Sequence, residues 1–253
     1  MNGFVFDLQL FTKVKTVKLT NKADEYTNKT QNVKIFALGG NDSIDNFNAS
    51  HVTIDGGLGD DYISNDESNE VKIYGNAGND SIVNGDSYTP GKLRYGGDKV
   101  KIYGGTGDDS IENLGKISKV YGDAGNDEIY NSGDYVTVNS GKGDDTVNNQ
   151  SDHTIVNSGA GNDFIITSSN NYSMTYNSTL SGGKGNDYIY DHNGHNYVLN
   201  GGLGNDEIFV EGSNNVTMNG GSGNDSLKYN YSVGTSINGY SGNDYVTTLV
   251  IRL

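Results

Sequence analysis

Cysteine and tryptophan are both missing from this chain of 253 residues, and proline occurs only once. Without cysteine the protein has no disulfides, no thiolate metal sites and no thiol nucleophile, and its redox compartment is left open. Glycine is abundant instead, with 37 residues, which is about twice the usual share. This glycine content, together with a hydrophobic fraction of only 33%, argues against long helices and a thick core.

Long apolar runs are missing as well. No segment approaches the roughly 18 residues that a membrane-spanning helix requires, so we expect no transmembrane helix. The N-terminal segment Met1–Asp7 lacks the basic start and the small-residue cleavage site of a secretory signal peptide. We therefore expect that any export uses a route other than a Sec-type signal peptide.

Positive charge is scarce, because 32 Asp and Glu residues outnumber 17 Lys and Arg residues and the formal net charge is −15. Nucleic acids and anionic lipids are bound through clustered Lys and Arg, which are scattered along this chain, so cations are the expected partners. Low hydrophobicity combined with high net charge is also typical of disordered chains. A folded state therefore requires something that offsets the negative charge.

An internal repeat organises most of the chain. With Gly56–Ser64 as the template, the same frame occurs eleven times and has an aspartate at its sixth position. Successive aspartates are 18 or 19 residues apart, except for two intervals of 29 and 24 residues. The motif aspartates, called the aspartate row below, are Asp42, Asp61, Asp80, Asp109, Asp127, Asp145, Asp163, Asp187, Asp206, Asp225 and Asp244. The unit is therefore 18 to 19 residues long, with two insertions.

The copies share features on both sides of the motif aspartate. The residue two positions before it is always glycine, and the residue directly before it is always Asn or Asp, types that suit tight turns. Aliphatic residues stand two positions after it and seven positions before it, in short segments that alternate apolar and polar residues. Each unit is thus predicted to contain two short strands and two turns.

A single unit cannot bury its two aliphatic side chains, whereas stacked units bury them in a narrow continuous core. We therefore predict an all-β fold, a parallel β-solenoid of about eleven coils that forms a rod on the order of 55 Å long. The insertions, residues 85–99 and 167–179, should bulge from the turn opposite the glycine motif. At that turn an asparagine column is interpreted as a side-chain ladder, with ordinary turn asparagines as the alternative. The column consists of Asn46, Asn65, Asn84, Asn113, Asn131 and Asn149.

The repeat Gly-Gly-x-Gly-x-Asp-x-aliphatic-x resembles the nonapeptide of the repeats-in-toxin (RTX) calcium-binding family over about residues 33–247. The resemblance implies a right-handed parallel β-roll in which the glycine-rich turns of adjacent coils hold Ca²⁺ between them. It implies that the side chains of the aspartate row bind the ions, together with backbone carbonyls from the first and third loop positions. In the copies assigned here, these carbonyls belong to Gly56, Leu58, Gly104, Thr106, Gly201, Leu203, Gly220 and Ser222.

The charge of the aspartate row gives a separate reason to expect a cation. Carboxylates stacked about 5 Å apart repel each other by on the order of 3 kcal/mol per neighbouring pair. Summed along the row, this repulsion exceeds the usual folding surplus of about 5 to 15 kcal/mol. Ca²⁺ accepts about six to eight oxygen ligands, whereas Mg²⁺ needs a stricter octahedron and Zn²⁺ prefers Cys and His. Calcium is therefore the expected cofactor.

The chain departs from the family pattern in one respect. The family usually has two nonapeptides in each coil, whereas each coil here has one, so we expect a single row of about ten Ca²⁺ ions between coils. Ten ions would change the net charge from −15 to about +5, and binding and folding should therefore be one event. The loops before Asp42, Asp145 and Asp163 deviate from the glycine pattern, which predicts weaker sites there.

The sequence before the first motif keeps the spacing of the repeat. Asp24 lies 18 residues before Asp42 but has no glycines around it, which predicts a degenerate capping coil. We thus divide the chain into residues 1–32 with an N-terminal strand and the capping coil, residues 33–247 with the β-roll, and residues 248–253 with a strand-like tail.

Both ends of the chain are apolar, at Phe4–Phe11 and at Leu249–Leu253. Each segment is expected either to fold over its own end of the core or to pair between molecules by strand addition. The second alternative predicts self-association of the rods.

Other signals in the sequence are weaker. Tyr74, Tyr103 and Tyr121 share one outward column, which is either a stripe that binds a sugar or a partner, or ordinary cross-strand packing. His192 and His195 form a short-spaced pair for which a metal role is the less favoured interpretation. The sequence has no Gly-x-Ser-x-Gly elbow, no His-Glu-x-x-His helix and no Walker loop, so we do not expect an enzyme.

These observations favour a calcium-folded extracellular or cell-surface β-roll with a structural or assembly role. In this hypothesis the rods stack end to end into fibres or a surface layer. The resemblance implies bacterial type I secretion of an unfolded, calcium-free chain that folds outside the cell. One alternative is an adhesin or glycan-binding module. Another is the calcium-binding portion of an exported toxin or enzyme, although residues 1–32 are too few for a catalytic domain.

Overall fold

The computed structural model describes residues 14–85, 96–168 and 175–249. These residues form β-strands and turns, and none of them lies in a helix. Accordingly, they include no helix that is long and apolar enough to cross a bilayer. The predicted all-β class is confirmed.

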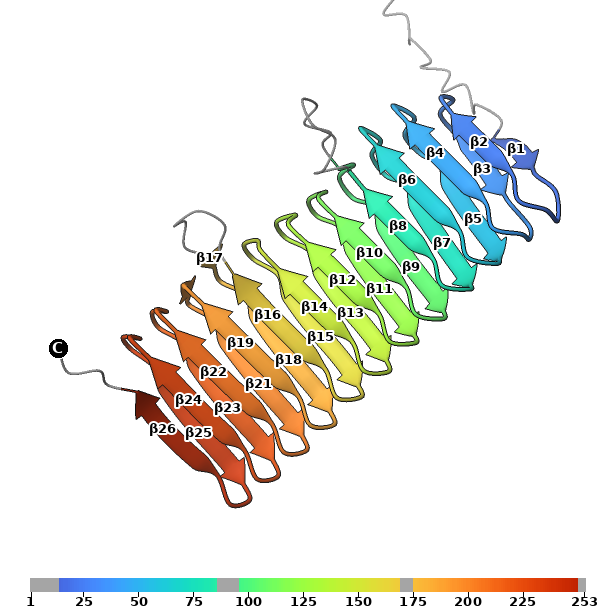
Figure 1. Ribbon diagram of the computed structural model, residues 1–253. Helices are drawn as coiled ribbons and strands as arrows, with labels where there is room; N and C mark the ends of the chain where they lie inside the picture. The colour runs from blue at the N-terminus through green and yellow to red at the C-terminus, as the bar shows by residue number, and fades with distance from the viewer. Residues whose placement is uncertain (1–13, 86–95, 169–174, 250–253) are drawn as a thin grey trace, which may run out of the picture.

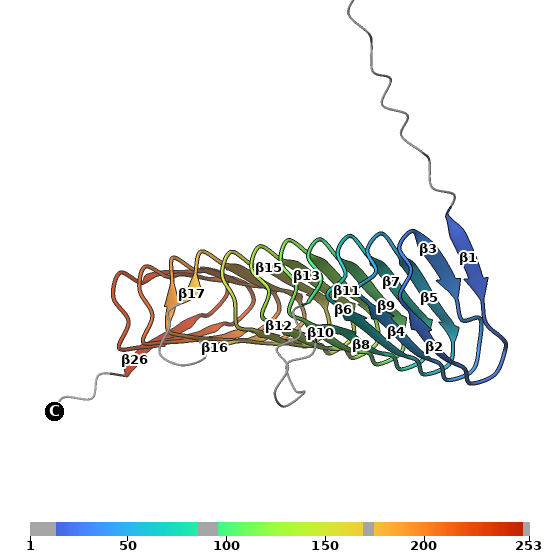
Figure 2. The same cartoon turned by 90° about the horizontal axis from the view of Figure 1, so that it is seen from above.

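The strands form two long parallel sheets that face each other along a rod (Figure 1, Figure 2). Each coil of the chain adds one strand to either sheet, so that each sheet has twelve strands. Sheet A consists of β1 (Lys15–Lys18), β3 (Val33–Phe36), β5 (Thr53–Leu58), β7 (Lys72–Ala77), β9 (Lys101–Thr106), β11 (Lys119–Ala124), β13 (Thr137–Lys142), β15 (Ile155–Ala160), β18 (Thr179–Lys184), β21 (Val198–Leu203), β23 (Thr217–Ser222) and β25 (Ser236–Ser241). Sheet B consists of β2 (Glu25–Asn28), β4 (Ser43–Phe47), β6 (Tyr62–Asp66), β8 (Ser81–Asn84), β10 (Ser110–Asn113), β12 (Glu128–Asn131), β14 (Thr146–Asn149), β16 (Phe164–Ser168), β19 (Tyr188–His192), β22 (Glu207–Glu211), β24 (Ser226–Asn230) and β26 (Tyr245–Leu249). A small third sheet pairs β17 (Thr175–Tyr176) with β20 (Gly194–His195).

Adjacent coils pair in the register that the repeat predicts. In sheet B, Ile63 lies opposite Ile82, and Ile82 lies opposite Ile111 although an insertion separates them in sequence. Ile165 and Ile189 are paired in the same way across the second insertion. Both insertions therefore leave the coil after a sheet B strand, at the turn opposite the glycine motif, as predicted.

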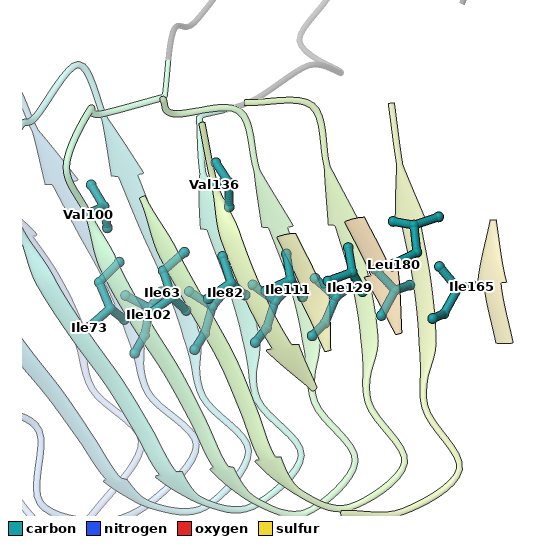
Figure 3. Packing of buried hydrophobic residues seen from close by; sticks show 14 of the residues in the cluster. Ile63, Ile73, Ile82, Val100, Ile102, Ile111, Ile129, Val136, Ile165 and Leu180 are labelled. Atoms are coloured by element: carbon teal, nitrogen blue, oxygen red, sulfur yellow. The ribbon is translucent and has the colours of Figure 1, made fainter. Parts of the chain in front are cut away.

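Two continuous columns of aliphatic side chains lie between the sheets (Figure 3). Each coil contributes one from sheet A and one from sheet B, such as Ile54 and Ile63. In the first ten motif-bearing coils these side chains are 0–1% exposed. A third, interrupted column of buried side chains lies beside them and consists of Val33, Val52, Val71, Val100, Val136 and Val216. Each side chain packs on its equivalents in the coils before and after it, so a few apolar residues per coil suffice for a continuous core.

The coil before the first motif continues both sheets. β1 places Val17 opposite Ile35, and β2 places Tyr26 opposite Ile44, which is the 18-residue register expected from the sequence. Val17 and Tyr26 are half-buried, whereas Ile35 and Ile44 are fully buried. The core thus ends gradually at this side of the rod.

Parts of several predicted features lie outside the described residues. These parts are the apolar segment Phe4–Phe11, residues 86–95 and 169–174 of the insertions, and the tail after Leu249. The expected pairing of the terminal segments therefore stays a prediction.

Candidate metal centre

Each glycine turn leads from a sheet A strand to the next sheet B strand, for example from β5 to β6. Gly57 and Gly59 in this turn have φ angles of 107° and 115°, a region that residues with a side chain rarely adopt. A Cβ atom on Gly59 would also come within 2.5 Å of the Gly40 carbonyl oxygen in the preceding coil. At the position of Gly59 the turns of adjacent coils are therefore stacked too closely for any other residue type, whereas the position of Gly57 carries Asn76 and Asp123 in other coils.

The aspartate side chains point into the interior of these turns. In all coils except the last they are only 1–2% exposed. One carboxylate oxygen of each accepts a hydrogen bond from the backbone of the preceding coil: the Asp42 N–H donates to Asp61 Oδ1 at 2.8 Å, and the Asp61 N–H donates to Asp80 Oδ1 at 2.8 Å. The same bond joins Asp206 N to Asp225 Oδ1 at 2.9 Å. One oxygen per carboxylate is thus fixed by the backbone.

The second carboxylate oxygen has no hydrogen-bond partner although it is buried. This is true of Oδ2 in Asp42, Asp61, Asp80, Asp109, Asp127, Asp145, Asp163, Asp187, Asp206 and Asp225. A buried carboxylate oxygen without a partner is costly, since it has lost its water and gained nothing in return. These oxygens are therefore candidates for binding a cation.

Backbone carbonyls converge on the same positions. A Cβ atom placed on Gly75 would overlap Asp80 Oδ2 and would lie 2.5 Å from the Gly104 carbonyl oxygen of the next coil. At Gly201 it would overlap Asp206 Oδ2 and would lie 2.5 Å from the Gly220 carbonyl oxygen. The first-position carbonyls of Gly104 and Gly220 thus lie beside a carboxylate oxygen, and Gly56 and Gly201 occupy the same loop position in their coils.

The third-position carbonyls, which the sequence predicts as metal ligands, also take part in hydrogen bonds between coils. Each accepts a hydrogen bond from a glycine N–H of the preceding coil. The acceptors are Leu58 (from Gly40, 2.8 Å), Thr106 (from Gly78, 2.9 Å), Leu203 (from Gly185, 2.8 Å) and Ser222 (from Gly204, 2.8 Å). A carbonyl oxygen has two lone pairs, so one remains available to a cation in each case.

The environment of the row makes the carboxylates hard to ionise in the absence of a cation. Burial raises the pKa of Asp61, Asp127 and Asp206 to about 6, and that of Asp109 and Asp163 to about 7. The backbone N–H bonds lower these pKa values, but they do not offset the loss of water. Neighbouring carboxylates raise them further. A dication in the row would reverse this effect by stabilising the ionised form.

The three aspartates with irregular loops have the same geometry as the others. Asp42, Asp145 and Asp163 are 1–2% exposed, and each has an unpartnered Oδ2. At the first loop position, Ser140 and Ser158 replace glycine before Asp145 and Asp163. The Ser140 hydroxyl donates to the Ser158 carbonyl at 2.9 Å. This bond occupies a carbonyl whose equivalents in other coils lie beside a carboxylate oxygen.

The two ends of the row differ from its middle. In the capping coil, Asp24 Oδ2 accepts hydrogen bonds from the Thr20 backbone N–H (2.8 Å) and from the Thr20 hydroxyl (2.7 Å). Local donors therefore do for Asp24 what a cation would do elsewhere. Asp244 accepts the Asp225 N–H at 3.1 Å and is half-buried.

The comparisons with known proteins agree with this geometry. Residues 48–69, 71–87, 96–113, 172–208 and 198–227 match the family model of the RTX calcium-binding nonapeptide repeat. The chain carries RTX-type calcium-binding repeats in a β-roll. It is thus a calcium-binding β-solenoid, and the expected cofactor is confirmed as Ca²⁺.

A solved structure is similar to this RTX β-roll in fold. It is the X-ray crystal structure of a hyperactive, Ca²⁺-dependent, β-helical antifreeze protein from an Antarctic bacterium. The match has a TM-score of 0.58 and 22% sequence identity, and it covers 90% of this chain and 83% of that one. None of the curated proteins matches the chain. At this level of identity the similarity supports the fold alone.

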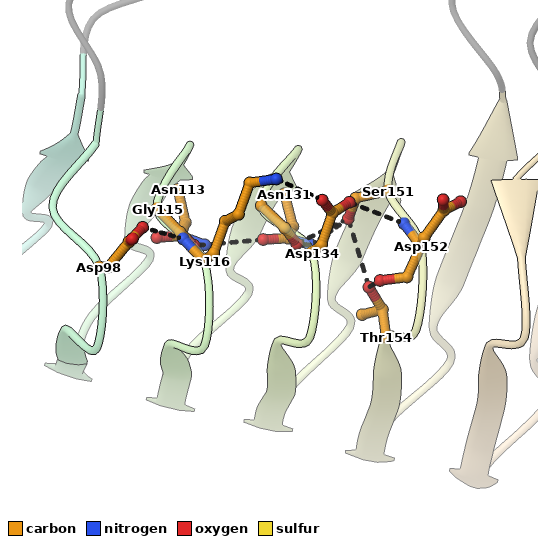
Figure 4. A network of polar contacts seen from close by, with 10 residues as sticks. Asp98, Asn113, Gly115, Lys116, Asn131, Asp134, Ser151, Asp152 and Thr154 are labelled. Carbon is orange, nitrogen blue, oxygen red and sulfur yellow. Dashed lines mark hydrogen bonds and ion pairs between the residues drawn. The ribbon is translucent and has the colours of Figure 1, made fainter.

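The opposite turn of the RTX β-roll contains the predicted asparagine ladder (Figure 4). Each asparagine Nδ2 donates to Oδ1 of the asparagine in the next coil at 2.7–2.8 Å, from Asn28 through Asn149. Each Nδ2 also donates to a carbonyl of its own turn, for example Asn113 to Gly115 at 2.9 Å. The side-chain ladder is therefore confirmed, and it also includes Asn28.

The histidines do not form a metal site with the acidic residues. Within residues 14–85, 96–168 and 175–249, no three His, Asp or Glu side chains come together as a potential metal site. His192 stacks on Tyr190, and His195 contacts Tyr176 edge to face. Calcium bound at the aspartate row would thus need backbone oxygens as ligands beside one or two carboxylates.

Proposed function

We propose that this RTX β-roll folds when Ca²⁺ fills the aspartate row, and that it acts outside the cell as a structural module whose rods join end to end. The proposal assigns about ten ions to a single row, one between each pair of adjacent motif-bearing coils. It includes no catalytic step. Residues 1–32 would cap the β-roll of residues 33–247, and residues 248–253 would form its tail.

The ligands in this proposal are the side chains of the aspartate row and the carbonyls of the first and third loop positions. The assigned carbonyls are those of Gly56, Leu58, Gly104, Thr106, Gly201, Leu203, Gly220 and Ser222. Support comes from the ten buried Oδ2 atoms without partners, which equal the number of gaps between eleven coils. The bound ions would neutralise carboxylates that otherwise repel each other.

The observation that carries the end-to-end assembly is the exposed core of the last coil. Val246 occupies the sheet B core column and is 49% exposed, whereas its ten equivalents are 0–1% exposed. Tyr245 beside it is 62% exposed. The strands β25 and β26 also form the ends of their sheets, with backbone groups that a further strand could pair with. A second rod that adds its β1 and β2 here would bury this surface.

The location outside the cell rests on the calcium chemistry. Extracellular calcium modules work at dissociation constants of about 10⁻⁴ to 10⁻³ M, because calcium is plentiful there. RTX repeats are typical of secreted proteins, and the absence of cysteine is compatible with an exterior location. Type I secretion of the unfolded, calcium-free chain fits a protein whose folding waits for the ion.

The antifreeze activity of the similar solved structure is not part of the proposal. A surface that matches a crystal lattice needs the same chemical group at regular intervals. The outward third positions of the glycine turns here differ from coil to coil, being Leu58, Ala77, Thr106, Ala124, Lys142, Ala160, Lys184, Leu203, Ser222 and Ser241. We extend only the calcium-dependent fold to this chain.

Analytical ultracentrifugation and electron microscopy with and without calcium test the assembly. Wild-type protein should form filaments in millimolar calcium, while Val246→Glu and Val17→Glu, at opposite ends of the rod, should stay monomeric. Ile155→Glu is the matched control, because Ile155 is 48% exposed on the outer side of β15 in the middle of the rod and should not affect assembly. Circular dichroism shows whether each variant is folded. A wild-type protein that is folded and strictly monomeric in calcium would overturn the assembly.

A further inference from the structure

The fold gathers three lysines that are far apart in the sequence. In sheet A, Lys72 is paired with Lys101 and Lys101 with Lys119, so that one lysine follows another in three successive coils. All three point outward and are exposed. The sequence alone gives the impression of scattered basic residues, whereas the structure aligns these three in one column.

A tyrosine column runs beside the lysines, two residues further along the same strands. The rings of Tyr74 and Tyr103 stack with centroids 4.9 Å apart and planes 6° from parallel, and those of Tyr103 and Tyr121 with centroids 4.8 Å apart and planes 3° from parallel. Both faces of the middle ring are therefore covered. The column offers a ligand its ring edges and hydroxyl groups rather than open ring faces. We call the three lysines and the three tyrosines the Lys–Tyr face.

The lysine charges on this face are not neutralised by the described part of the chain. None of the three lysines forms an ion pair there, unlike Lys116 and Lys228, which bind Asp134 and Glu207 at 2.7 and 2.6 Å. Three ammonium groups about 5 Å apart repel each other weakly, and an anionic ligand would relieve that repulsion.

Polar groups with acceptor oxygens border the tyrosines. Asp123 lies two residues after Tyr121 on the same outward side, in register with Gly105 of the neighbouring coil. Asp55 precedes Tyr74 in the tyrosine column and accepts a hydrogen bond from Asn76 Nδ2 at 2.9 Å. The face therefore presents a row of lysine cations and, beside it, a row of phenolic hydroxyls. One carboxylate, Asp55, lies at the end of the tyrosine row, and the other, Asp123, lies beyond Tyr121 on the same strand.

These groups define the chemistry of a fitting ligand. It must carry anions at intervals near the 4.8 Å spacing of the coils to meet the lysines. It must also carry hydroxyl groups, which can bind the phenols as well as Asp123. A carboxylated polysaccharide has an anion and several hydroxyls on each sugar ring. A nucleic acid fits less well, because its bases need open aromatic faces to stack on.

We infer that the Lys–Tyr face binds an acidic polysaccharide, with the polymer running along the long axis of the rod. The site lies on the side of the β-roll, away from the exposed last coil, and is independent of the proposed assembly. It rests on the calcium-folded state only because the three strands must be formed.

Isothermal titration calorimetry of the calcium-loaded protein with short oligogalacturonates tests this inference. Wild-type protein should bind, and its affinity should fall as salt rises. The triple variant Lys72→Gln, Lys101→Gln, Lys119→Gln should bind about tenfold more weakly, a loss of about 1.4 kcal/mol shared among three exposed ion pairs. Tyr103→Phe should weaken binding less, because it removes one hydroxyl.

The matched control is Lys18→Gln, Lys22→Gln, Lys29→Gln, which changes the net charge equally at exposed positions outside the face. It should bind like the wild type. Equal loss in both triple variants would show non-specific attraction and overturn the site. If polyaspartate or single-stranded DNA bound more tightly than oligogalacturonate, the polysaccharide would be overturned as the ligand in favour of an acidic peptide or a nucleic acid. Circular dichroism and the calcium midpoint establish that each variant is folded.

Discussion

The two turns of each coil bury polar side chains of nearly equal size and treat them in opposite ways. Asn131 at one turn and Asp127 at the other are 0% and 2% exposed. The amide of Asn131 donates to Asn149 and accepts from Asn113, so it needs nothing from outside the protein. The carboxylate of Asp127 accepts the Asp109 N–H, while its Oδ2 has no partner.

This difference follows from the chemistry of the two groups. An amide has both donors and an acceptor, so a column of identical amides can satisfy itself from coil to coil. An ionised carboxylate only accepts, so a column of carboxylates leaves oxygens unpaired and accumulates negative charge. The asparagine ladder therefore stabilises the rod by itself, whereas the aspartate row stabilises it only together with a cation.

Among the changes that separate the two turns, removal of calcium is expected to have the largest effect on folding. In excess chelator at pH 7.5, the row loses its cations and the whole chain should lose its β-sheet circular dichroism signal, because repulsion along the row exceeds a folding surplus of about 5 to 15 kcal/mol. Added calcium should restore the signal, while magnesium at equal concentration should restore much less. A chelated sample that retains its full β signal at pH 7.5 would contradict this account of the row.

Acid should partly replace calcium. The metal-free folded state raises the pKa of Asp61 to about 6 and that of Asp109 to about 7, above the value of roughly 3.9 in an unfolded chain. The folded state therefore binds more protons between these values, and its stability should rise as the pH falls from 7 to 4. In chelator, the β signal should increase over that range. A signal that stays flat or falls would show that charge in the row is not what keeps the metal-free chain unfolded.

Much of this architecture could be predicted from the sequence because the chain repeats itself. Eleven copies reveal the coil length, both core columns, the aspartate row and the asparagine column, since a residue that recurs at a fixed position must be needed there. The register across the insertion between Ile82 and Ile111 is likewise fixed by the motif rather than by the distance in sequence.

What the sequence did not reveal depends on contacts between coils. The bond from the Asp42 N–H to Asp61 Oδ1 involves a backbone donor, which leaves no trace in residue type. The hydrogen bonds to the third-position carbonyls are of the same kind. Thr20 as a substitute for a cation at Asp24 occurs once, so no repetition marks it. The lysine column extends over only three coils, because Thr53 and Thr137 occupy the same outward position on either side of it, so no repetition along the whole chain marks it.

A carboxylate placed in the asparagine ladder tests, in a single coil, whether that turn tolerates a buried charge. Asn131→Asp removes the donation to Asn149 and to the Gly133 carbonyl, and it buries a carboxylate where no cation site exists. We expect a loss of about 3 to 5 kcal/mol in the free energy of unfolding at pH 7.5 in calcium, measured by urea denaturation. The control Asn126→Asp makes the same change at an exposed turn position and should alter stability by less than about 0.5 kcal/mol. Equal effects of the two substitutions would show that burial in the ladder is not decisive.

The smallest expected effect comes from the reverse exchange, Asp127→Asn, and it should change sign with calcium. In calcium the substitution removes one charged ligand, so the calcium midpoint of folding should rise and the free energy of unfolding should fall by about 1 to 3 kcal/mol. In chelator the same substitution removes a buried carboxylate that repels Asp145, so it should make the metal-free fold easier to form. The β signal of the variant in chelator should therefore exceed that of the wild type at pH 7.5 and equal it at pH 4, where the wild-type carboxylate is protonated.

Glu128→Gln, at the neighbouring residue on the outer surface, is the control for Asp127→Asn and should show neither effect. If Asp127→Asn lowered stability equally in calcium and in chelator, the carboxylate would have a packing role in the turn, and the contrast between the two turns would not rest on the cation.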